Sequence, residues 1–323
     1  PGPFASPETA LPISLPNGLP AAAALAAEGV TVAGSAALHR GGTRPLRICL
    51  VNLMPKKTAT ETQICRLFGA TAVPVEVTLC VPDSHQSRSA QDHIDAFYRR
   101  WSQIRGEHFD GMVMTGAPIE TLPFEAVDYW MDLCAMFEWA RARVAAGFYI
   151  CWAAQAALYH FRGVPKHERA AKLSGVYRQR LARADSGLLK GFGDEFPVPV
   201  SRYTEVRAAD LPAGVTVLAQ SAETGLCLVE DRANRATCMF NHLEYDTETL
   251  RDEFHRDRVA GKQPAIPANY FLDGDPTRPA ANVWRPWAHL LFGNWLTEIA
   301  RGSARNDPVT HPAGLESALR LYR

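Results

Sequence analysis

One cysteine of this chain stands directly between an apolar run and a helix-forming run. Gly-Phe-Tyr-Ile precedes Cys151, and Trp-Ala-Ala-Gln-Ala-Ala-Leu follows it with no loop residues between. We expect a strand, a sharp turn at Cys151, and a helix whose first amide groups lie beside the sulfur. Those amides and the helix dipole favour the thiolate, which is the nucleophilic form of cysteine. The pattern predicts covalent catalysis by Cys151, with the amide of Trp152 and one neighbouring loop forming an oxyanion hole.

A histidine and a glutamate further along the chain can complete a catalytic set. In Asn-His242-Leu-Glu244 the two side chains are two positions apart at the end of an expected strand, so they share a face and Glu244 can orient the imidazole. A nucleophile, a base and an orienting acid are what acyl transfer requires. Taken singly, Cys151 could be a buried structural cysteine and His242 a surface histidine. Their combination favours catalysis.

Four basic residues have local patterns that leave two interpretations open. Lys56 and Lys57 are adjacent, and either form a solvated pair or bind the phosphates of an acyl donor. Arg202 and Arg256 could clamp a substrate carboxylate, although a surface arginine is the default for each.

The elements that must position these residues alternate between strand-like and helix-like runs. Buried strands are expected at 46–53, 75–81, 109–116 and 148–151, with helices at 60–68 and 124–146. This alternation predicts an α/β fold with a doubly wound, mostly parallel sheet. In such sheets ligands bind beyond the carboxyl ends of the strands. Residues 52–57, 115–120, Cys151 and 242–244 all fall at such ends.

The second half of the chain has a looser pattern. Apolar runs at 215–219, 226–229 and 236–240 predict a small antiparallel addition that closes at the His242 loop. A helix is expected over 247–261 with Asp246 as its N-cap, and a last helix over 284–299. We expect an extended arm and a short helix at 1–35, one catalytic domain at 36–300, and a loosely held tail at 301–323.

Composition and charge argue against several other classes of function. The 323 residues include 34 basic and 34 acidic side chains, so no nucleic-acid footprint is expected. No apolar run reaches about 18 residues, and the first residues lack the features of a signal peptide, so we expect no membrane association. The seven cysteines are odd in number and scattered, which predicts a reducing compartment, the cytoplasm. No zinc-ligand spacing occurs, so no metal is expected.

Six dispersed motifs, in order along the chain, resemble one family of enzymes. They are similar to those of the homoserine O-acyltransferases of the homoserine trans-succinylase type. The motifs are Asn52-Leu-Met-Pro-Lys-Lys57, Thr115-Gly-Ala-Pro118, Cys151-Trp-Ala-Ala-Gln-Ala-Ala-Leu158, Lys172-Leu-Ser-Gly-Val176, Ser201-Arg-Tyr203 and Glu244-Tyr-Asp246. The resemblance implies a class I glutamine amidotransferase-like (flavodoxin-like) fold with flanking helices and a homodimer. It also implies acyl transfer from acyl-CoA to the hydroxyl of homoserine in methionine biosynthesis, with no bound cofactor.

The resemblance also implies roles for particular residues. Cys151 matches the acyl-thioester nucleophile, His242 the general base and Glu244 its orienting acid. The positions that match contacts to the amino-acid substrate are Lys172, Ser201 and Arg256. Glu120 matches the position that sorts the acyl donor, where relatives with Gly resemble succinyltransferases and those with Glu resemble acetyltransferases. A carboxylate there would repel a succinyl carboxylate and narrow the pocket. We therefore expect acetyl-CoA as the co-substrate.

Several residues depart from the family pattern near the expected amino-acid pocket. Asn241 and Leu243 stand where Gly and Pro are usual, Val200 replaces a His, and Arg178 lies in an altered segment. L-homoserine is the first expectation for the acceptor, and L-serine is the alternative, with acetyl or succinyl as the group transferred. A glutamine amidotransferase or hydrolase is disfavoured because the usual glycines around the nucleophile are missing. A non-catalytic relative is disfavoured by the intact Cys/His/Glu set.

Overall fold

The structure is a computed structural model that describes residues 13–34, 38, 44–86 and 90–304. The first twelve residues of the expected arm and residues 305–323 of the tail expected at 301–323 lie outside these described residues, whereas residues 301–304 continue the last helix. The proposed division into arm, catalytic domain and tail therefore stays a prediction.

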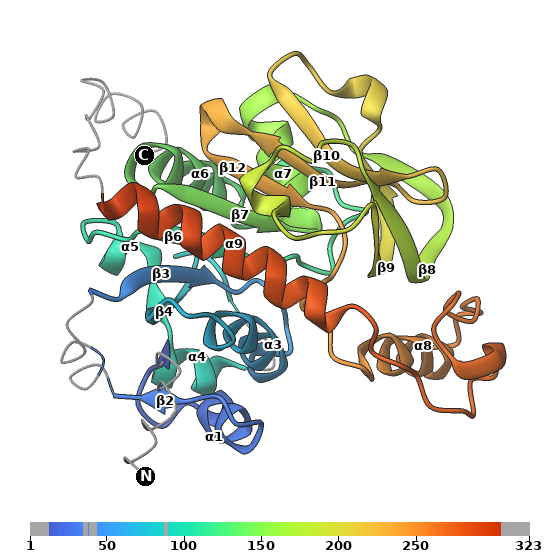
Figure 1. The fold of residues 1–323 in the computed structure, drawn as a ribbon, viewed down its shortest axis with the longest axis horizontal. Helices are drawn as coiled ribbons and strands as arrows, with labels where there is room; N and C mark the ends of the chain where they lie inside the picture. Colours follow the sequence, from blue (N-terminus) through green and yellow to red (C-terminus); the bar gives the residue numbers. More distant parts are fainter. Residues whose placement is uncertain (1–12, 35–37, 39–43, 87–89, 305–323) are drawn as a thin grey trace, which may run out of the picture.

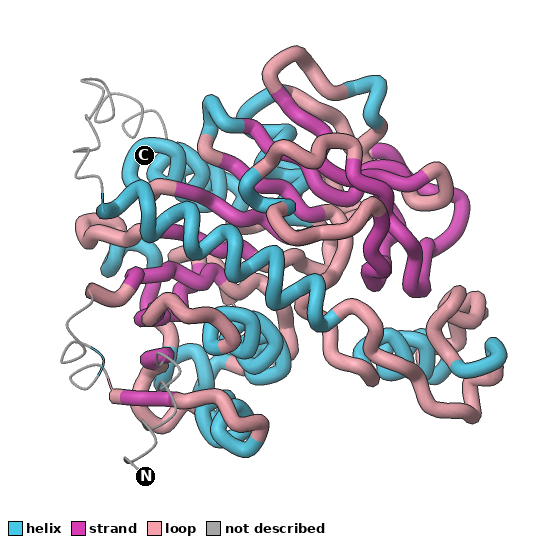
Figure 2. Tube along the Cα trace, viewed as in Figure 1, coloured by secondary structure: helices cyan, strands magenta, loops and turns pink. Residues whose placement is uncertain are grey.

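The described residues form one mixed β-sheet with helices on both of its faces (Figures 1 and 2). The strand order is β2-β1-β4-β3-β6-β7-β12-β11-β10-β8-β9, with β5 paired to β4. The strands are β1 (Ile13–Ser14), β2 (Val32–Ala33), β3 (Leu46–Val51), β4 (Val75–Val81), β5 (Arg99–Arg100), β6 (Gly111–Met114), β7 (Ala146–Ile150), β8 (His167–Leu181), β9 (Glu195–Glu205), β10 (Val215–Ser221), β11 (Gly225–Asp231) and β12 (Ala236–Met239).

The sheet has a parallel half and an antiparallel half that meet at β12. Strands β1 to β7 pair in parallel, as the alternation of strands and helices predicts, whereas β12, β11, β10, β8 and β9 pair as an antiparallel series. The expected meander is confirmed for β10, β11 and β12. In addition, β12 pairs in parallel with β7, with Met239 opposite Ile150. The ends of β7 and β12 are therefore neighbours, and the residues that follow them begin side by side.

Helices cover the sheet and connect its strands. They are α1 (Pro20–Ala27), α3 (Lys57–Gly69), α4 (Gln91–Phe97), α5 (Trp101–Ile104), α6 (Trp130–Arg143), α7 (Trp152–Arg162), α8 (Thr249–Val259) and α9 (Arg285–Ala304). The single helix expected over 124–146 is divided. A 3₁₀ turn at Phe124–Ala126 precedes α6, and the rings of Phe124 and Trp130 stack 5.4 Å apart across the break. None of the helices in the described ranges combines the length and the apolar character that a bilayer span would need.

The central strand β7 shows how the core divides between the two faces. Successive side chains of a strand point to opposite faces. Phe148 packs against Phe292 of α9 with ring centres 4.7 Å apart, whereas Tyr149 packs against Phe137 of α6 at 5.5 Å. Both strand residues are buried. Helix α9 crosses one face of the sheet along its length (Figure 1), and α6 and α7 cover the other. This packing holds the carboxyl end of β7, and hence Cys151, in place.

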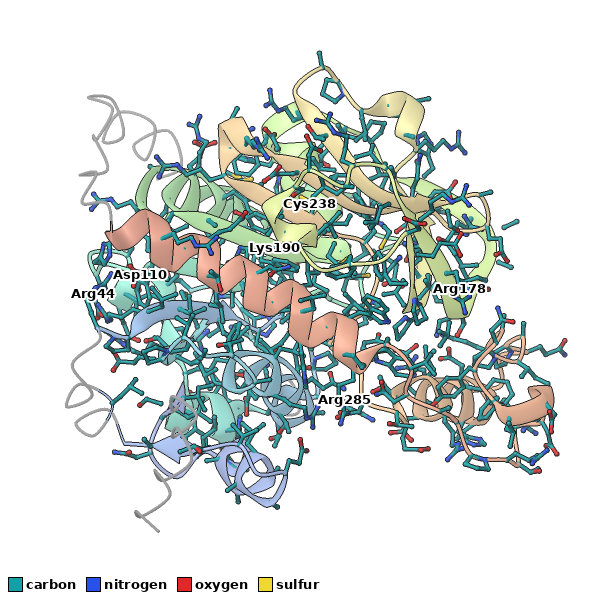
Figure 3. The ribbon with its side chains drawn as sticks, in the orientation of Figure 1. Arg44, Asp110, Arg178, Lys190, Cys238 and Arg285 are labelled. Atoms are coloured by element: carbon teal, nitrogen blue, oxygen red, sulfur yellow. The ribbon has the colours of Figure 1, made fainter. Side chains whose placement is uncertain are left out.

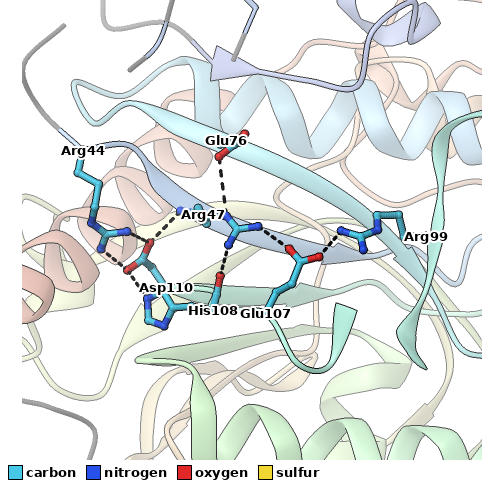
Figure 4. Close-up of polar contacts among 7 residues, drawn as sticks. All are labelled: Arg44, Arg47, Glu76, Arg99, Glu107, His108 and Asp110. Carbon is cyan, nitrogen blue, oxygen red and sulfur yellow. Dashed lines mark hydrogen bonds and ion pairs between the residues drawn. The ribbon is translucent and has the colours of Figure 1, made fainter. Parts of the chain in front are cut away.

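A polar network ties together the strand β3 and the segments before β6 (Figure 4). The buried Asp110 carboxylate accepts hydrogen bonds from both terminal nitrogens of Arg44 (3.0 and 2.6 Å) and from the amide of Arg47 (2.8 Å). The side chain of Arg47 reaches Glu107 at 2.7 Å, and Arg99 also donates to Glu107 at 2.5 Å. These contacts lie at the amino ends of β3 and β6, opposite the edge that carries Cys151.

Two features of the second half were not expected from the sequence. Strands β8 and β9 form a long antiparallel hairpin, and the segment that contains α8 stands beside it, apart from the main body (Figure 1). The predicted N-cap of this helix is wrong. Helix α8 begins at Thr249, and its N-cap, Glu248, makes no side-chain cap. The Asp246 carboxylate instead accepts hydrogen bonds from Arg66 (2.5 Å) and from Arg285 at the start of α9 (3.0 Å; Figure 3).

Candidate active site

Cys151 occupies the turn between β7 and α7 with an unusual backbone conformation. Its φ of 52° and ψ of −112° lie in a region that non-glycine residues seldom adopt. The turn is held by a hydrogen bond from the Cys151 amide to the Met239 carbonyl (2.7 Å), and its own carbonyl accepts from Ala154 and Gln155. The side chain makes no cap for α7. Of the seven cysteines, six are buried and Cys151 alone is partly exposed, so its sulfur is the one that a substrate can reach.

The loop after β6 lies directly against this turn. A Cβ atom placed on Gly116 would stand 3.2 Å from the Cys151 Cβ and 3.4 Å from the Ile150 carbonyl oxygen, so only glycine fits without displacement. The first amides of a helix have no partner within the helix. Trp152 and Ala153 occupy these positions in α7. Their amides and the Gly116 loop frame the space beside the sulfur in which an oxyanion could be held.

His242 and Glu244 form the pair expected from their spacing. Nδ1 of His242 lies 2.6 Å from Oε1 of Glu244, and an N–H there donates to the carboxylate. Both side chains are buried, and the His242 amide is held by the Pro199 carbonyl at 2.9 Å. With Nδ1 engaged, Nε2 remains for the Cys151 thiol, whose side chain is within hydrogen-bonding reach of the imidazole.

The electrostatics of this site favour a charged imidazole. Burial disfavours the imidazolium, but the negative charges of Glu244 and Cys151 outweigh it and raise the pKa of His242 well above its ordinary value. The geometry thus provides a nucleophile within hydrogen-bonding reach of a proton carrier.

A second polar cluster adjoins His242 and centres on Glu253 of α8. The ring of Tyr245 stacks on His242 at 4.2 Å, and its hydroxyl donates to Oε1 of Glu253 at 2.8 Å. Oε2 of Glu253 accepts from Lys172 Nζ at 3.0 Å and from the Ser201 hydroxyl. Burial raises the pKa of Glu253, but Lys172, the Ser201 hydroxyl and His242 together lower it below its ordinary value. Two of the predicted substrate-binding residues, Lys172 and Ser201, therefore meet next to the predicted base.

The predicted residue Arg256 lies at the rim of this cluster. Its guanidinium is largely exposed and donates to Oδ1 of Asp257 at 3.1 and 3.2 Å. The other oxygen of Asp257 accepts from Lys172 at 3.1 Å. Arg256 thus presents an accessible cation beside the carboxylates of α8.

Sequence reasoning missed Glu253, Asp257, Tyr245 and Gly116. One signal could have found two of them, because Glu253 and Asp257 are four positions apart and share one face of α8. Tyr245 and Gly116 carry no local signal of their roles, since each depends on a partner from another part of the chain.

Arg202 does not have the free guanidinium that a substrate clamp requires. It is fully buried and donates to the side-chain oxygen of Asn241 (2.6 Å), the Phe240 carbonyl (3.2 Å) and the Thr224 carbonyl. Burial lowers the pKa of Arg202 to about 10. The expectation that it clamps a carboxylate is corrected, because both terminal nitrogens of its buried guanidinium already donate to groups of the protein, among them the segment that carries His242.

Lys57 also departs from its expected place. It is buried, donates to the Asn52 carbonyl at 2.6 Å and lies over the ring of Tyr98 at 5.7 Å. Burial lowers the pKa of Lys57 to about 8. A contact with the phosphates of an acyl donor is therefore not available to Lys57, whereas its neighbour Lys56 is exposed.

Glu120 lies at the far end of the loop that begins at Gly116, and it is partly exposed. The loop is anchored by Lys166, whose ammonium donates to the carbonyls of Glu120 (2.5 Å) and Leu122 and lies 4.4 Å from the ring centre of Phe124. The position that matches the acyl-donor determinant is thus on the same loop that contacts Cys151.

Three of the residues that depart from the family pattern are buried. They are Val200, Asn241 and Leu243, whereas Arg178 is exposed on β8 (Figure 3). Asn241 is hydrogen-bonded to Arg202. Val200 adjoins Ser201, and Asn241 and Leu243 adjoin His242, so the expectation that these changes flank the amino-acid pocket stays a prediction.

Comparison with known proteins gives close matches over nearly the whole chain. The family model described as homoserine O-succinyltransferase matches residues 12–303. A homoserine O-acetyltransferase from Rhizorhabdus wittichii is 52% identical over 294 residues, covering 90% of this chain and 92% of that protein. A homoserine O-acetyltransferase from Brucella canis is 50% identical over 292 residues, covering 90% of this chain and 95% of that protein.

Comparison with solved structures concerns the fold alone. A glutamine amidotransferase from Methylobacillus flagellatus aligns with a TM-score of 0.50 and 15% identity over 78% of this chain and 94% of that chain. A protein described as part of a GMP synthase from Thermoplasma acidophilum aligns with a TM-score of 0.51 and 14% identity over 81% and 98% of the two chains. The predicted class of fold is confirmed.

Proposed function

The chain belongs to the homoserine O-succinyltransferase family, and we propose that it transfers acetyl from acetyl-CoA to the hydroxyl of L-homoserine. The observation that carries the proposal is the hydrogen bond of His242 to Glu244, with the accessible Cys151 within hydrogen-bonding reach of the imidazole. The relatives at 50% and 52% identity, named homoserine O-acetyltransferases, support the acceptor and the acetyl group. Glu120 supports acetyl over succinyl because a carboxylate there would repel the second carboxylate of a succinyl donor.

The first half of the proposed reaction acetylates the enzyme. The Cys151 thiolate forms a bond to the carbonyl carbon of acetyl-CoA, and the resulting oxyanion is held by the amide of Trp152 and the Gly116 loop. The bond between that carbon and the sulfur of CoA then breaks. The departing CoA sulfur takes the proton of the His242 imidazolium, which leaves a neutral imidazole and an acetyl thioester.

The second half transfers the acetyl group to the acceptor. Nε2 of His242 removes the proton of the acceptor hydroxyl, whose oxygen forms a bond to the thioester carbon. The bond to Cys151 breaks and returns the thiolate, while the proton stays on His242. Glu244 holds the imidazole through Nδ1 during both proton transfers.

The cluster beside His242 supports an amino-acid acceptor. A zwitterion needs a cation for its carboxylate and an anion for its ammonium group. Arg256 offers an accessible guanidinium, and the carboxylate of Glu253 is joined to His242 through Tyr245.

The test measures release of the CoA thiol by the purified protein. Acetyl-CoA and succinyl-CoA are each paired with L-homoserine, L-serine and no acceptor. We expect turnover with acetyl-CoA and homoserine alone, and an acetyl mass on the Cys151 peptide after incubation with acetyl-CoA without acceptor. Cys151→Ser should lose turnover and the acetyl mass. Cys134 is a buried cysteine on α6, and Cys134→Ala should keep turnover and the acetyl mass.

Three outcomes would contradict the proposal. Turnover with serine but not homoserine would overturn the acceptor. Turnover without an acetyl-enzyme would overturn the covalent step and favour direct transfer. Glutaminase activity without any turnover of an acyl-CoA would replace the proposal with an amidotransferase.

We also propose a homodimer that works in the cytoplasm. Four large apolar side chains are exposed on the segment that includes the end of α8, namely Val259, Ile266, Leu272 and Val283, and a second copy could cover them. All seven cysteines are unpaired, which suits a reducing compartment and a nucleophilic thiol. Light scattering of the purified protein should give twice the chain mass of 35.5 kDa, and a monomer would contradict the dimer.

A further inference from the structure

A cleft opens beside the Gly116 loop, at the carboxyl ends of β3, β4 and β6. Its volume is about 530 Å³, within the range of about 300–1,000 Å³ that is usual for small-molecule sites. Apolar side chains line one part and polar groups another. The lining includes Leu53, Ser84, His85, Ala117, Ile119 and Tyr129. None of these residues belongs to the catalytic set or to the cluster around Glu253.

The cleft is joined to the nucleophile through one short loop. Ala117 lines the cleft, and the preceding Gly116 is the residue that contacts the Cys151 turn. The Thr115 hydroxyl accepts from the Leu53 amide at 2.8 Å, so a hydrogen bond joins the loops after β3 and β6. A molecule that lies in the cleft can therefore extend one end past Gly116 to the sulfur of Cys151.

The sheet order separates this cleft from the acceptor cluster. Strand β7, which carries Cys151, lies between β6 and β12. The cleft is on the β6 side, whereas His242 follows β12 and the Glu253 cluster is built from β8, β9 and α8. Two reactants can thus approach Cys151 from opposite sides.

We propose that this cleft holds the pantetheine arm of the acyl-CoA donor, an inference that rests on the proposed function. The arm is long, uncharged and mixed in character, with two amides, one hydroxyl and a pair of geminal methyl groups. Leu53 and Ile119 provide apolar surface for the methyl groups. Ser84 and His85 provide hydrogen-bonding groups for the amides.

The polar groups of the cleft are suited to an uncharged ligand. Burial, with the nearby charges of Lys57 and Arg100, lowers the pKa of His85 to about 4, so its imidazole is neutral at pH 7. Its ring stands edge-on to Tyr129 at 5.1 Å. Asp128 also lines the cleft, and its carboxylate disfavours the phosphates of CoA there. The phosphate end therefore extends past Pro55, where Lys56 is exposed.

The test compares acetyl-CoA with a short thioester, S-acetyl-N-acetylcysteamine, which lacks the nucleotide and most of the arm. In Ile119→Trp the larger side chain fills the cleft without touching Cys151. We expect the KM for acetyl-CoA to rise about ten-fold or more, while kcat/KM for the short thioester stays within about two-fold. Tyr129→Ala changes the other wall of the cleft and should also raise the KM for acetyl-CoA. Leu122→Trp, on the same loop but outside the cleft, should behave as the unaltered protein.

Each remaining outcome overturns part of the inference. An unchanged KM for acetyl-CoA in both variants would overturn the cleft assignment alone. An equal fall in kcat/KM for both donors in both variants would place the effect in the catalytic centre. This result would also overturn the cleft assignment. If the unaltered protein releases no thiol from either donor, the proposed function itself fails.

Discussion

At Cys151 the backbone and the side chain are both arranged for reaction. A non-glycine residue with φ of 52° stores about 1–3 kcal/mol of strain, which the surrounding hydrogen bonds must offset. The turn places Cβ of Cys151 beside Gly116, with the side chain within hydrogen-bonding reach of His242. Because each of these contacts depends on a few atoms, single substitutions at this scale should change chemistry more than stability.

Replacing Glu244 by Gln should expose the role of its charge. The variant can keep a hydrogen bond to Nδ1 but loses the carboxylate that raises the pKa of His242. We expect kcat to fall about 100-fold or more. The raised pKa contributes stability below the unfolded value of about 6.5 that is lost as pH rises through the folded value. Urea unfolding should therefore show that Glu244→Gln lowers the free energy of unfolding more at pH 6 than in alkaline solution.

Two observations would contradict this interpretation of Glu244. A pH-independent loss of stability would show that its charge does not act on His242. A similar loss of kcat in Glu223→Gln, an exposed carboxylate in the turn between β10 and β11, would show a nonspecific effect.

Replacing Glu120 by Gly should relax the choice of acyl donor. Removal of the carboxylate removes repulsion of a succinyl group and widens the pocket. We expect the ratio of kcat/KM for succinyl-CoA over acetyl-CoA to rise about ten-fold or more. Glu120→Gln keeps the size of the side chain and removes its charge. The two variants together therefore separate charge repulsion of the succinyl group from narrowing of the pocket. An unchanged ratio in both would mean that the donor is selected elsewhere.

At the scale of elements, one glycine joins the α8 segment to the sheet. Gly175 of β8 bridges Ala268, with hydrogen bonds from Val176 to the Ala268 carbonyl (2.8 Å) and from Ala268 to the Ser174 carbonyl (3.0 Å). Its φ is 150°, and a Cβ there would stand 2.4 Å from the Ala268 oxygen. Since α8 carries Glu253, this bridge helps to fix the distance between the acceptor cluster and His242.

Gly175→Ala should therefore damage acceptor binding and leave the first half-reaction intact. The clash is with backbone, which cannot rotate away, so we expect a loss of about 1–3 kcal/mol in the free energy of unfolding. The KM for homoserine should rise about ten-fold or more, while acetylation of Cys151 by acetyl-CoA alone keeps its rate.

A matched glycine tests the specificity of this effect. Gly193 has open space around its Cα and no left-handed φ, so Gly193→Ala should be neutral. A loss of acetylation in Gly175→Ala comparable to the loss in homoserine turnover would mean that the bridge supports the whole site rather than the acceptor side.

At the scale of the whole molecule, stability and catalysis are built at opposite edges of the sheet. The carboxyl edge carries Cys151, the cleft and the acceptor cluster. The amino edge of β3 and β6 carries the network around Asp110 (Figure 4). Burial raises the pKa of Asp110, but the hydrogen bonds from Arg44 and Arg47 outweigh it and lower the pKa below its ordinary value. Loss of this network should affect folding without reaching the site.

Asp110→Asn should lower the free energy of unfolding by about 1–3 kcal/mol at pH 7, a range that allows for the exposure of Arg44. A lowered pKa contributes stability above the unfolded value of about 3.9 that is lost as pH falls through the folded value. The variant and the unaltered protein should thus converge in acid, with kcat/KM unchanged at pH 7. Asp185→Asn, which breaks an exposed ion pair with Arg183, should lower the free energy of unfolding by less than Asp110→Asn does. A fall in kcat/KM for Asp110→Asn would contradict the separation of the two edges.

Features that depend on residues close together in the chain could be predicted from the amino-acid sequence. The strand before Cys151 and the helix after it follow from an apolar run that changes directly into a helix-forming run. The contact of His242 with Glu244 follows from their spacing of two positions. The parallel pairing of the first strands follows from the alternation of apolar and amphipathic segments. Such patterns are readable because backbone periodicity fixes which near neighbours share a face.

The polar groups that meet from distant parts of the chain could not be predicted in this way. Lys172 and Ser201 converge on Glu253 through the docking of α8 beside β8 and β9, which no local pattern predicts. Lys57 and Arg202 carry the same charges as surface residues, yet the packing of neighbouring elements buries them. A side chain's charge is set by its type, whereas its accessibility is set by what covers it. Long-range packing therefore decided which of the candidate residues a substrate can reach.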